Sequence, residues 1–167
     1  NAEFAYQLGD VGGPGLRTLD QRAWFGYADL GASFRAGPVS GAFKGVWLQA
    51  SGDESATDGT HGGFLPLAPD THRFLGLVNA FPQLRNIRRA GASANARYAV
   101  FGRPLTAQLD YSNFARVETG DQFQPSVRDA SKSSLGNEFD LTLGFEPLHG
   151  VFILSGGGLL LPGDAYG

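Results

Sequence analysis

The stretch GASANARYAVFGRPLTAQLDYSNFARVE, residues 91–118, is the part of this chain that decides its fold. From 105 to 118, apolar and polar residues alternate, and only the Asn-Phe pair at 113–114 is out of step. From 91 to 101, alanines, a tyrosine and a valine alternate with Ser, Asn and Arg in the same way. Successive side chains of a strand point to opposite faces of a sheet. The pattern therefore predicts a β-hairpin with one apolar and one polar face, turning at Gly102-Arg103-Pro104.

Both arms of this hairpin are long for strands of a soluble protein. A typical strand has roughly 5–6 residues, whereas a tilted strand that crosses a bilayer needs roughly 9–11. Seven long segments of this kind can be drawn, at Ala2–Gly9, Ala23–Arg35, Ala42–Asp53, Gly91–Phe101, Leu105–Glu118, Asn137–Pro147 and Val151–Leu161. We therefore predict an all-β fold, an antiparallel transmembrane β-barrel, with residues 1–167 as a single barrel segment whose apolar face contacts the lipid bilayer. In the third segment we place Val46, Leu48 and Ala50 on that apolar face, with Lys44 at its edge.

The connections between these segments alternate between long and short. The long ones are 10–22, 54–90 and 119–136, and the short ones are 36–41, 102–104 and 148–150. Bacterial outer-membrane barrels have short periplasmic turns and longer extracellular loops. We therefore expect the first strand to run outward and 54–90 to be a long outer loop. Its part His72–Phe81 is apolar enough to pack into the mouth or along the wall. Since an odd number of strands does not close such a barrel, we expect further strands, and a larger barrel, outside this chain.

Composition excludes several classes of protein. The net charge is −3 and there is no basic block, so a nucleic-acid partner is not expected. There is no cysteine, which excludes disulfides and thiolate metal sites. The polar loop Asp53–Gly59 lacks the pattern of an EF-hand, the three histidines are scattered, and no nucleophile elbow is present. Asp110 and Asp140 could be drawn as an acid pair, but a polar lumen also contains such pairs. We expect no enzyme, no metal site and no cofactor.

The candidate binding residues are the charges on the polar faces of the segments, which a barrel would turn toward its lumen. They are Arg35, Arg97, Arg116, Asp29, Asp110, Glu138 and Asp140. They could form cross-strand ion pairs that stiffen the wall. Alternatively, the three arginines could form a cationic track for an anionic solute, because guanidinium groups bind carboxylates through a planar fork. Arg85, Arg88 and Arg89 are expected at the outer mouth, either as solvated loop charges or as an electrostatic funnel.

Several motifs, in order along the chain, resemble those of the alginate-export family of outer-membrane porins. They are Trp47–Asp53 with its Ser-Gly-Asp ending, Phe64-Leu65-Pro66, His72–Val78, Asn86, Leu109-Asp110-Tyr111 with Phe114, Leu135–Leu141 and Leu161-Pro162-Gly163. The resemblance covers roughly residues 42–163. It implies a large single-chain barrel of up to eighteen strands, of which this chain is the C-terminal portion without the last strand. It also implies an arginine-rich pore that passes an anionic uronate polymer, with Arg35, Arg97 and Arg116 as pore lining.

The favoured functional hypothesis is a channel in the bacterial outer membrane that passes an anionic solute, an acidic polysaccharide such as alginate. Selectivity would come from the lumen arginines and from the long outer loop acting as a constriction or lid. The alternative is a plugged structural barrel that holds partner proteins of the periplasm or the outer membrane. A soluble ligand-binding β-barrel is a third reading, which the continuous apolar faces oppose.

Overall fold

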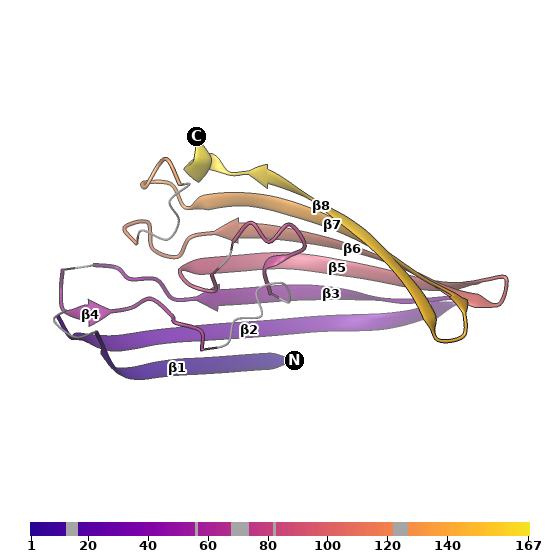
Figure 1. Cartoon of the computed structure of the whole chain (residues 1–167), viewed down its shortest axis with the longest axis horizontal. Coiled ribbons are helices and arrows are strands. Elements are labelled where there is room, and N and C mark those ends of the chain that lie inside the picture. Colours follow the sequence, from indigo (N-terminus) through magenta and orange to yellow (C-terminus); the bar gives the residue numbers. More distant parts are fainter. Residues whose placement is uncertain (13–16, 56, 68–73, 82, 122–126) are drawn as a thin grey trace.

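The computed structural model of this chain describes residues 1–12, 17–55, 57–67, 74–81, 83–121 and 127–167. Within these residues the elements are β1 (Ala2–Val11), β2 (Leu19–Ala36), β3 (Val39–Ala50), β4 (Thr60–His61), β5 (Ile87–Val100), β6 (Arg103–Ala115), β7 (Ser134–Leu148), β8 (Val151–Pro162) and the 3-10 helix η1 (Asp164–Tyr166). The long strands form one sheet in the order β1-β2-β3-β5-β6-β7-β8, each antiparallel to its neighbours (Figure 1). The short β4 pairs with β2 in parallel.

The long strands have the length that the alternation predicts. They range from 10 residues in β1 to 18 residues in β2, so each could cross a bilayer, which needs roughly 9–11 residues. The predicted all-β antiparallel fold is therefore confirmed. The sheet is open, with β1 and β8 at its two edges. Among the described residues, no helix is long and apolar enough to span a membrane.

The connections fall into two classes at opposite ends of the sheet (Figure 1). Two-residue turns join β2 to β3, β5 to β6 and β7 to β8 at what we call the short-turn end, and the long connections lie at the long-loop end. The turn of the β5–β6 hairpin is Phe101-Gly102, because Val100 pairs with Arg103. Both turn residues have positive φ, +51° and +72°, as a type I′ turn requires. The predicted turn was thus one residue late, and Arg103 and Pro104 belong to β6.

One face of the sheet is apolar and uncovered. We call it the outer face, and it exposes large apolar side chains from every long strand. These include Phe4, Tyr6, Leu8, Leu30, Phe43, Trp47, Tyr98, Leu105, Leu109, Tyr111, Phe139, Leu141, Leu143, Leu159 and Leu161. Leu30 is 85% exposed and Phe4 is 69% exposed. A soluble monomer rarely exposes so large a continuous apolar surface, so the outer face suits contact with lipid.

The faces of β3 differ from the prediction. Leu48 pairs with Tyr27 on one side and Arg89 on the other, and paired residues share a face of the sheet. Val46, Leu48 and Ala50 are therefore on the inner face, where Leu48 and Ala50 are fully buried, and Phe43 and Trp47 are on the outer face. Apolar residues occur on both faces of this strand, so periodicity alone could not orient it.

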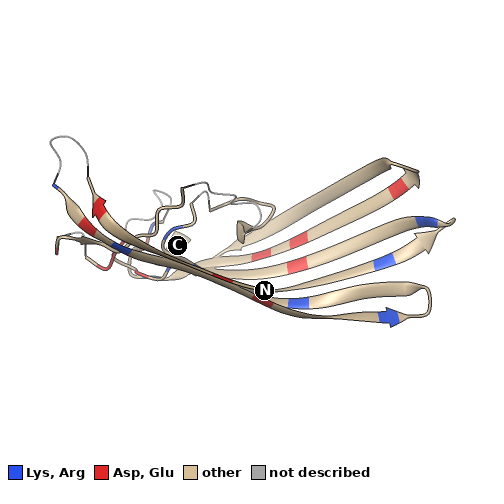
Figure 2. Ribbon diagram, turned by 90° about the horizontal axis from the view of Figure 1, so that it is seen from below, with Lys and Arg blue, Asp and Glu red and all other residues tan. Residues whose placement is uncertain are grey.

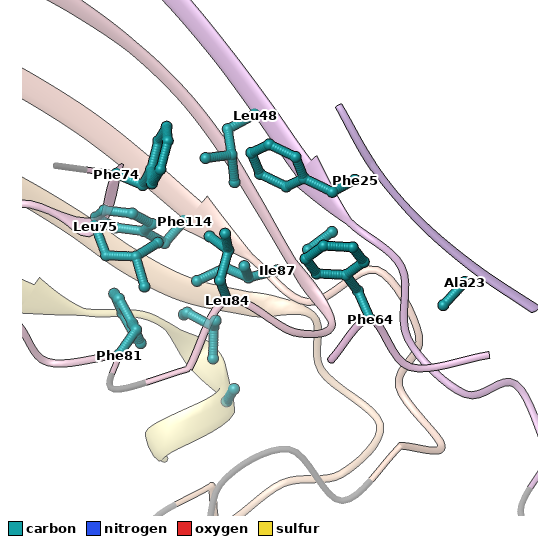
Figure 3. Close-up of a cluster of buried hydrophobic side chains, with 13 residues drawn as sticks. Ala23, Phe25, Leu48, Phe64, Phe74, Leu75, Phe81, Leu84, Ile87 and Phe114 are labelled. Carbon is teal, nitrogen blue, oxygen red and sulfur yellow. The ribbon is translucent and has the colours of Figure 1, made fainter. Parts of the chain in front are cut away.

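The inner face is covered near the long-loop end by part of the long connection before β5. Phe64, Phe74, Leu75, Phe81 and Leu84 pack there against side chains of the strands. Together the cluster comprises Ala23, Phe25, Leu48, Ala50, Phe64, Phe74, Leu75, Phe81, Leu84, Ile87, Phe114, Leu135 and Ala165 (Figure 3). The rings of Phe81 and Phe114 have centroids 4.7 Å apart. Phe114 was out of step with the alternation because it faces inward to fill this cluster. Of the predicted apolar part His72–Phe81, residues 74–81 lie against the inner face, and 72–73 are outside the described residues.

Candidate lumen-facing site

The strand register arranges the inner-face residues in rows that cross the sheet. Nearest the short turns, one row contains Arg35, Ser40, Arg97 and Thr106. Two positions along each strand, the next row contains Ser33, Ala42, Asn95, Gln108 and Thr142. The third contains Gly31, Lys44, Ser93, Asp110 and Asp140, and the fourth Asp29, Val46, Gly91, Ser112 and Glu138. Charges of both signs thus share the inner face. Figure 2 marks the positions of the charged residues along the strands.

The basic residues gather on β2, β3 and β5. Arg35 and Arg97 lie on either side of Ser40 and line a recess of about 510 Å³ with polar groups of Ser33 and Asn95. Lys44 lies further along β3 on the same face. All three cations are exposed. Within the described part of the chain, none of them makes an ion pair or a hydrogen bond through its side chain. We call Arg35, Lys44 and Arg97 the cationic patch.

The acidic residues gather on β6 and β7. Asp110 lies beside Asp140 in the register, and its carboxylate accepts a hydrogen bond of 2.8 Å from the side chain of Gln108. Glu138 and Asp140 are 1% and 4% exposed, because the segment before β5 covers them. Backbone N–H groups of this segment donate to both carboxylates, from Val78 to Glu138 at 3.0 Å and from Leu77 to Asp140 at 3.1 Å.

The three arginines expected at the outer mouth lie in three different environments. Arg89 is buried on the inner face, where it donates to the carbonyl of Phe74 at 2.7 Å and to the hydroxyl of Ser112 at 2.9 Å. Arg85 forms an ion pair of 2.9 Å with Asp121. Arg88 is exposed, and its neighbours in the register place it on the outer face.

Arg116 is placed apart from Arg35 and Arg97. It follows the last residue of β6 at the long-loop end, whereas Arg35 and Arg97 are near the short turns. It is 4% exposed and donates to the backbone carbonyls of Ala130, at 2.7 Å, and Lys132, at 2.6 Å. It fastens the connection after β6. Of the three arginines expected to line a track, the structure brings Arg35 and Arg97 together.

Asp29 lies near the edge strand β1 rather than with the other acids. Its carboxylate accepts hydrogen bonds from the hydroxyl of Tyr27 at 2.7 Å and from the side-chain amide of Asn1 at 3.0 Å. In the row that contains Asp29, Val46 and Gly91 stand between it and Ser112. Asp29 therefore contributes to the wall at β2 and is not part of the acidic group on β6 and β7.

Sequence reasoning missed three inner-face or loop residues. Lys44 was placed at the edge of the lipid face, although its register puts it with the lumen charges. Arg89 was placed at the mouth, although it has the same parity as the inward Ser93. Asn86 is fully buried with φ +50°; its side-chain oxygen accepts from the N–H groups of Val117 and Glu118 at 3.1 and 2.7 Å. No local pattern marks Asn86 for this role, because its partners are 31 and 32 residues away.

The described inner face thus carries exposed cations on β2, β3 and β5, and carboxyl groups that accept hydrogen bonds on β6 and β7. In the parts of the chain that are described, no three His, Cys, Asp or Glu side chains are grouped so that they could hold a metal ion. No curated protein and no solved structure matches this chain. The family model described as alginate export matches residues 1–167. Because that match spans the whole sequence, the chain belongs to the alginate export family.

Proposed function

We propose that this chain forms part of the wall of an outer-membrane channel that exports an anionic polysaccharide, alginate or a related uronate polymer. The family is one of outer-membrane export channels rather than of enzymes. The observation that carries the proposal for this chain is the contrast between its two faces. The outer face is apolar and uncovered, and the inner face exposes Arg35, Lys44 and Arg97, which have no ion-pair partner among the described residues.

The backbone supports a closed wall. β1 and β8 each leave one edge without a partner in this chain, and an unpaired strand edge in lipid leaves backbone N–H and C=O groups without hydrogen bonds. Further strands would pair with both edges and close the sheet into a barrel. The inner face would then line the lumen, and the outer face would contact the lipid chains.

The cationic patch fits a polymer that carries a carboxylate on each sugar. Arg35 and Arg97 are separated by one strand, so their backbones are roughly 10 Å apart at the usual strand spacing. Each guanidinium can hold one carboxylate of the chain through a charge-assisted fork. Asp110 and the acids beside it on β6 and β7 repel the same carboxylates. This keeps binding weak enough for the polymer to leave, as conduction requires.

The test is single-channel conductance of the protein reconstituted in planar bilayers, with oligouronates added as blockers. We expect an anion-selective current that oligouronates block and that neutral oligosaccharides of equal length block less. Replacing Arg97 with Ala should weaken the block about tenfold, since loss of one such contact costs about 1.4 kcal/mol. The matched control is Arg88→Ala, which removes the same charge from the outer face and should leave the block unchanged.

Two results would contradict the proposal. Verified insertion without any current would contradict the channel itself, and an equal weakening of the block by Arg88→Ala and Arg97→Ala would contradict the cationic patch as its binding site. The second candidate function, a plugged structural barrel, is supported by the apolar cluster that fills part of the inner face. It predicts no current in the same bilayers.

A further inference from the structure

The segment that lies on the inner face has two parts with different packing. Phe74, Leu75 and Phe81 are buried in the apolar cluster, and we call them the root. Between them, residues 76–80 form a tip that reaches β7 and β8. In the tip, Leu77 is 49% exposed and Val78 is 39% exposed. The root is thus held by apolar burial, whereas the tip needs another kind of attachment.

Hydrogen bonds from its backbone attach the tip to β7. The N–H of Leu77 donates to Asp140 at 3.1 Å and the N–H of Val78 donates to Glu138 at 3.0 Å. Both acceptors belong to carboxyl groups, which makes these bonds stronger than bonds between neutral groups. At the root, Arg89 donates to the carbonyl of Phe74 at 2.7 Å. The side chains of Glu138, Asp140 and Arg89 on the inner wall therefore all bind the backbone of one short segment.

The wall is shaped to receive the tip. Gly76 has φ +87°, and a Cβ there would collide with the carboxyl group of Glu138. A Cβ at Gly158 of β8 would collide with Asp140 and with Val78. A Cβ at Gly156 would lie 3.4 Å from the side chain of Leu77. The glycine-rich middle of β8 therefore leaves the space in which the tip lies.

Burial of the carboxyl groups of Glu138 and Asp140 beneath the tip is electrostatically unfavourable. One oxygen of Glu138 and one of Asp140 are buried without a hydrogen-bond partner among the described residues. Buried carboxyl groups are costly unless they are paired, and neither of these two forms an ion pair in the parts of the chain that are described. If the two carboxyl groups formed ion pairs that stiffen the wall, these oxygens would have partners. The hydrogen bonds that the structure gives both groups lead to the tip.

We propose that Glu138 and Asp140 are positioning residues that hold residues 76–80 against β7 and β8 and thereby set the width of the channel's constriction. This inference rests on the proposed channel function. The apolar root remains in place when the tip is released, so the tip can move into the lumen while the wall stays folded. The polymer would then pass between the held tip and the cationic patch on the facing strands.

The test compares two double variants in single-channel recordings. Glu138→Gln with Asp140→Asn removes both charges but keeps a carbonyl acceptor at each position, so the open current should stay as quiet as in the unchanged protein. Glu138→Leu with Asp140→Leu removes charge and acceptor, so the freed tip should raise the noise of the open current several-fold. Asp29→Leu is the control, because Asp29 lies in the same row as Glu138 but accepts from Tyr27 and Asn1 rather than from the tip.

A quiet leucine variant would overturn the proposal, and so would equal noise in the amide variant or in Asp29→Leu. A silent unchanged protein would contradict the channel itself, which separates the two failures. A second measurement does not depend on the leucine variant folding. Leu77→Cys with Gly156→Cys, treated in membranes with a short thiol-to-thiol crosslinker, should become joined, because a Cβ at Gly156 would lie 3.4 Å from the side chain of Leu77. Absence of the crosslink in an otherwise folded protein would place the tip elsewhere and overturn the proposal.

Discussion

The two halves of the inner face use charge in opposite ways. On β2, β3 and β5, Arg35, Lys44 and Arg97 are exposed and, among the described residues, unpaired. On β6 and β7, Glu138 and Asp140 are buried and bonded to the backbone of a folded-in segment. We call the part of the inner face around Arg35, Lys44 and Arg97 the open half. We call the part under residues 74–81, with Glu138, Asp140 and the apolar cluster, the covered half. A charge that is left free can serve a passing solute, whereas a charge that is already bonded shapes the passage.

The covered half also contains the apolar cluster, which explains where the stability of the inner face comes from. Phe81, Phe114, Leu48, Leu75 and Ile87 are fully buried, and burial of such a side chain contributes about 1.5–3 kcal/mol. The open half has no comparable cluster near the short turns. Changes in the covered half should therefore alter stability, and changes in the open half should alter selectivity.

The largest effect is expected from Phe114→Ala in the covered half. Phe114 is fully buried in the cluster and contacts no solvent. The change therefore leaves a cavity next to Phe81 and should cost about 3–5 kcal/mol. Urea unfolding of the protein in lipid vesicles measures this loss. Phe101→Asn, at a turn residue that is 98% exposed, is the control and should change stability by less than about 0.5 kcal/mol. Equal losses would mean that the cluster does not stabilise the inner face.

A smaller loss of stability is expected from Arg89→Met. The change removes the hydrogen bonds that Arg89 donates to the carbonyl of Phe74 and the hydroxyl of Ser112, which should cost about 1–3 kcal/mol. Limited proteolysis should then cut near Phe74 faster than in the unchanged protein. Arg88→Met removes the neighbouring charge from the outer face and should leave the cleavage rate as it was. Faster cleavage in both variants would show a general effect of charge.

The open half should respond in selectivity rather than in stability. Arg35→Gln with Arg97→Gln removes two unpaired cations near the short turns, so the reversal potential in a salt gradient should shift toward cation selectivity. The free energy of unfolding measured in urea should stay within about 0.5 kcal/mol of that of the unchanged protein, because neither side chain has a partner among the described residues. A stability loss as large as that of Arg89→Met would show that the two halves do not differ in this way.

The strand pattern of the sheet was predictable from the sequence because most strands carry apolar residues on one face only. Alternation placed Leu109 and Tyr111 on the outer face and Asp110 and Ser112 on the inner face, as the register does. It failed on β3, where apolar residues lie on both faces. The inward residues Leu48 and Ala50 pack beneath the connection between β3 and β5. No local sequence pattern predicts that contact.

The contacts of the site were less predictable than the strands. The bond between Val78 and Glu138 joins residues 60 positions apart, and periodicity carries no information over that distance. Arg116 could be assigned a face, but its carbonyl partners Ala130 and Lys132 come from the following connection. The positions of Arg35 and Arg97 were easier to predict. Each is on a regular strand, so alternation along the strand is enough to assign its face.

The smallest effect on the free energy of unfolding is expected from Gly→Ala changes at two glycines, which separate the cost of backbone conformation from the cost of a steric clash. A Cβ at Gly102 or at Gly157 would meet no atom within 4 Å, so neither Gly→Ala change creates a clash. Gly102 has φ +72° in the β5–β6 turn, and an L-residue there costs about 1–2 kcal/mol. Gly157 has no such φ and lies within β8, where Ala should stabilise by about 0.4–1 kcal/mol through the unfolded chain. Opposite signs in urea unfolding are therefore expected. A loss of similar size at both positions would mean that the outer face at Gly157 contacts a neighbour, and that the lipid-facing assignment of this part of β8 is wrong.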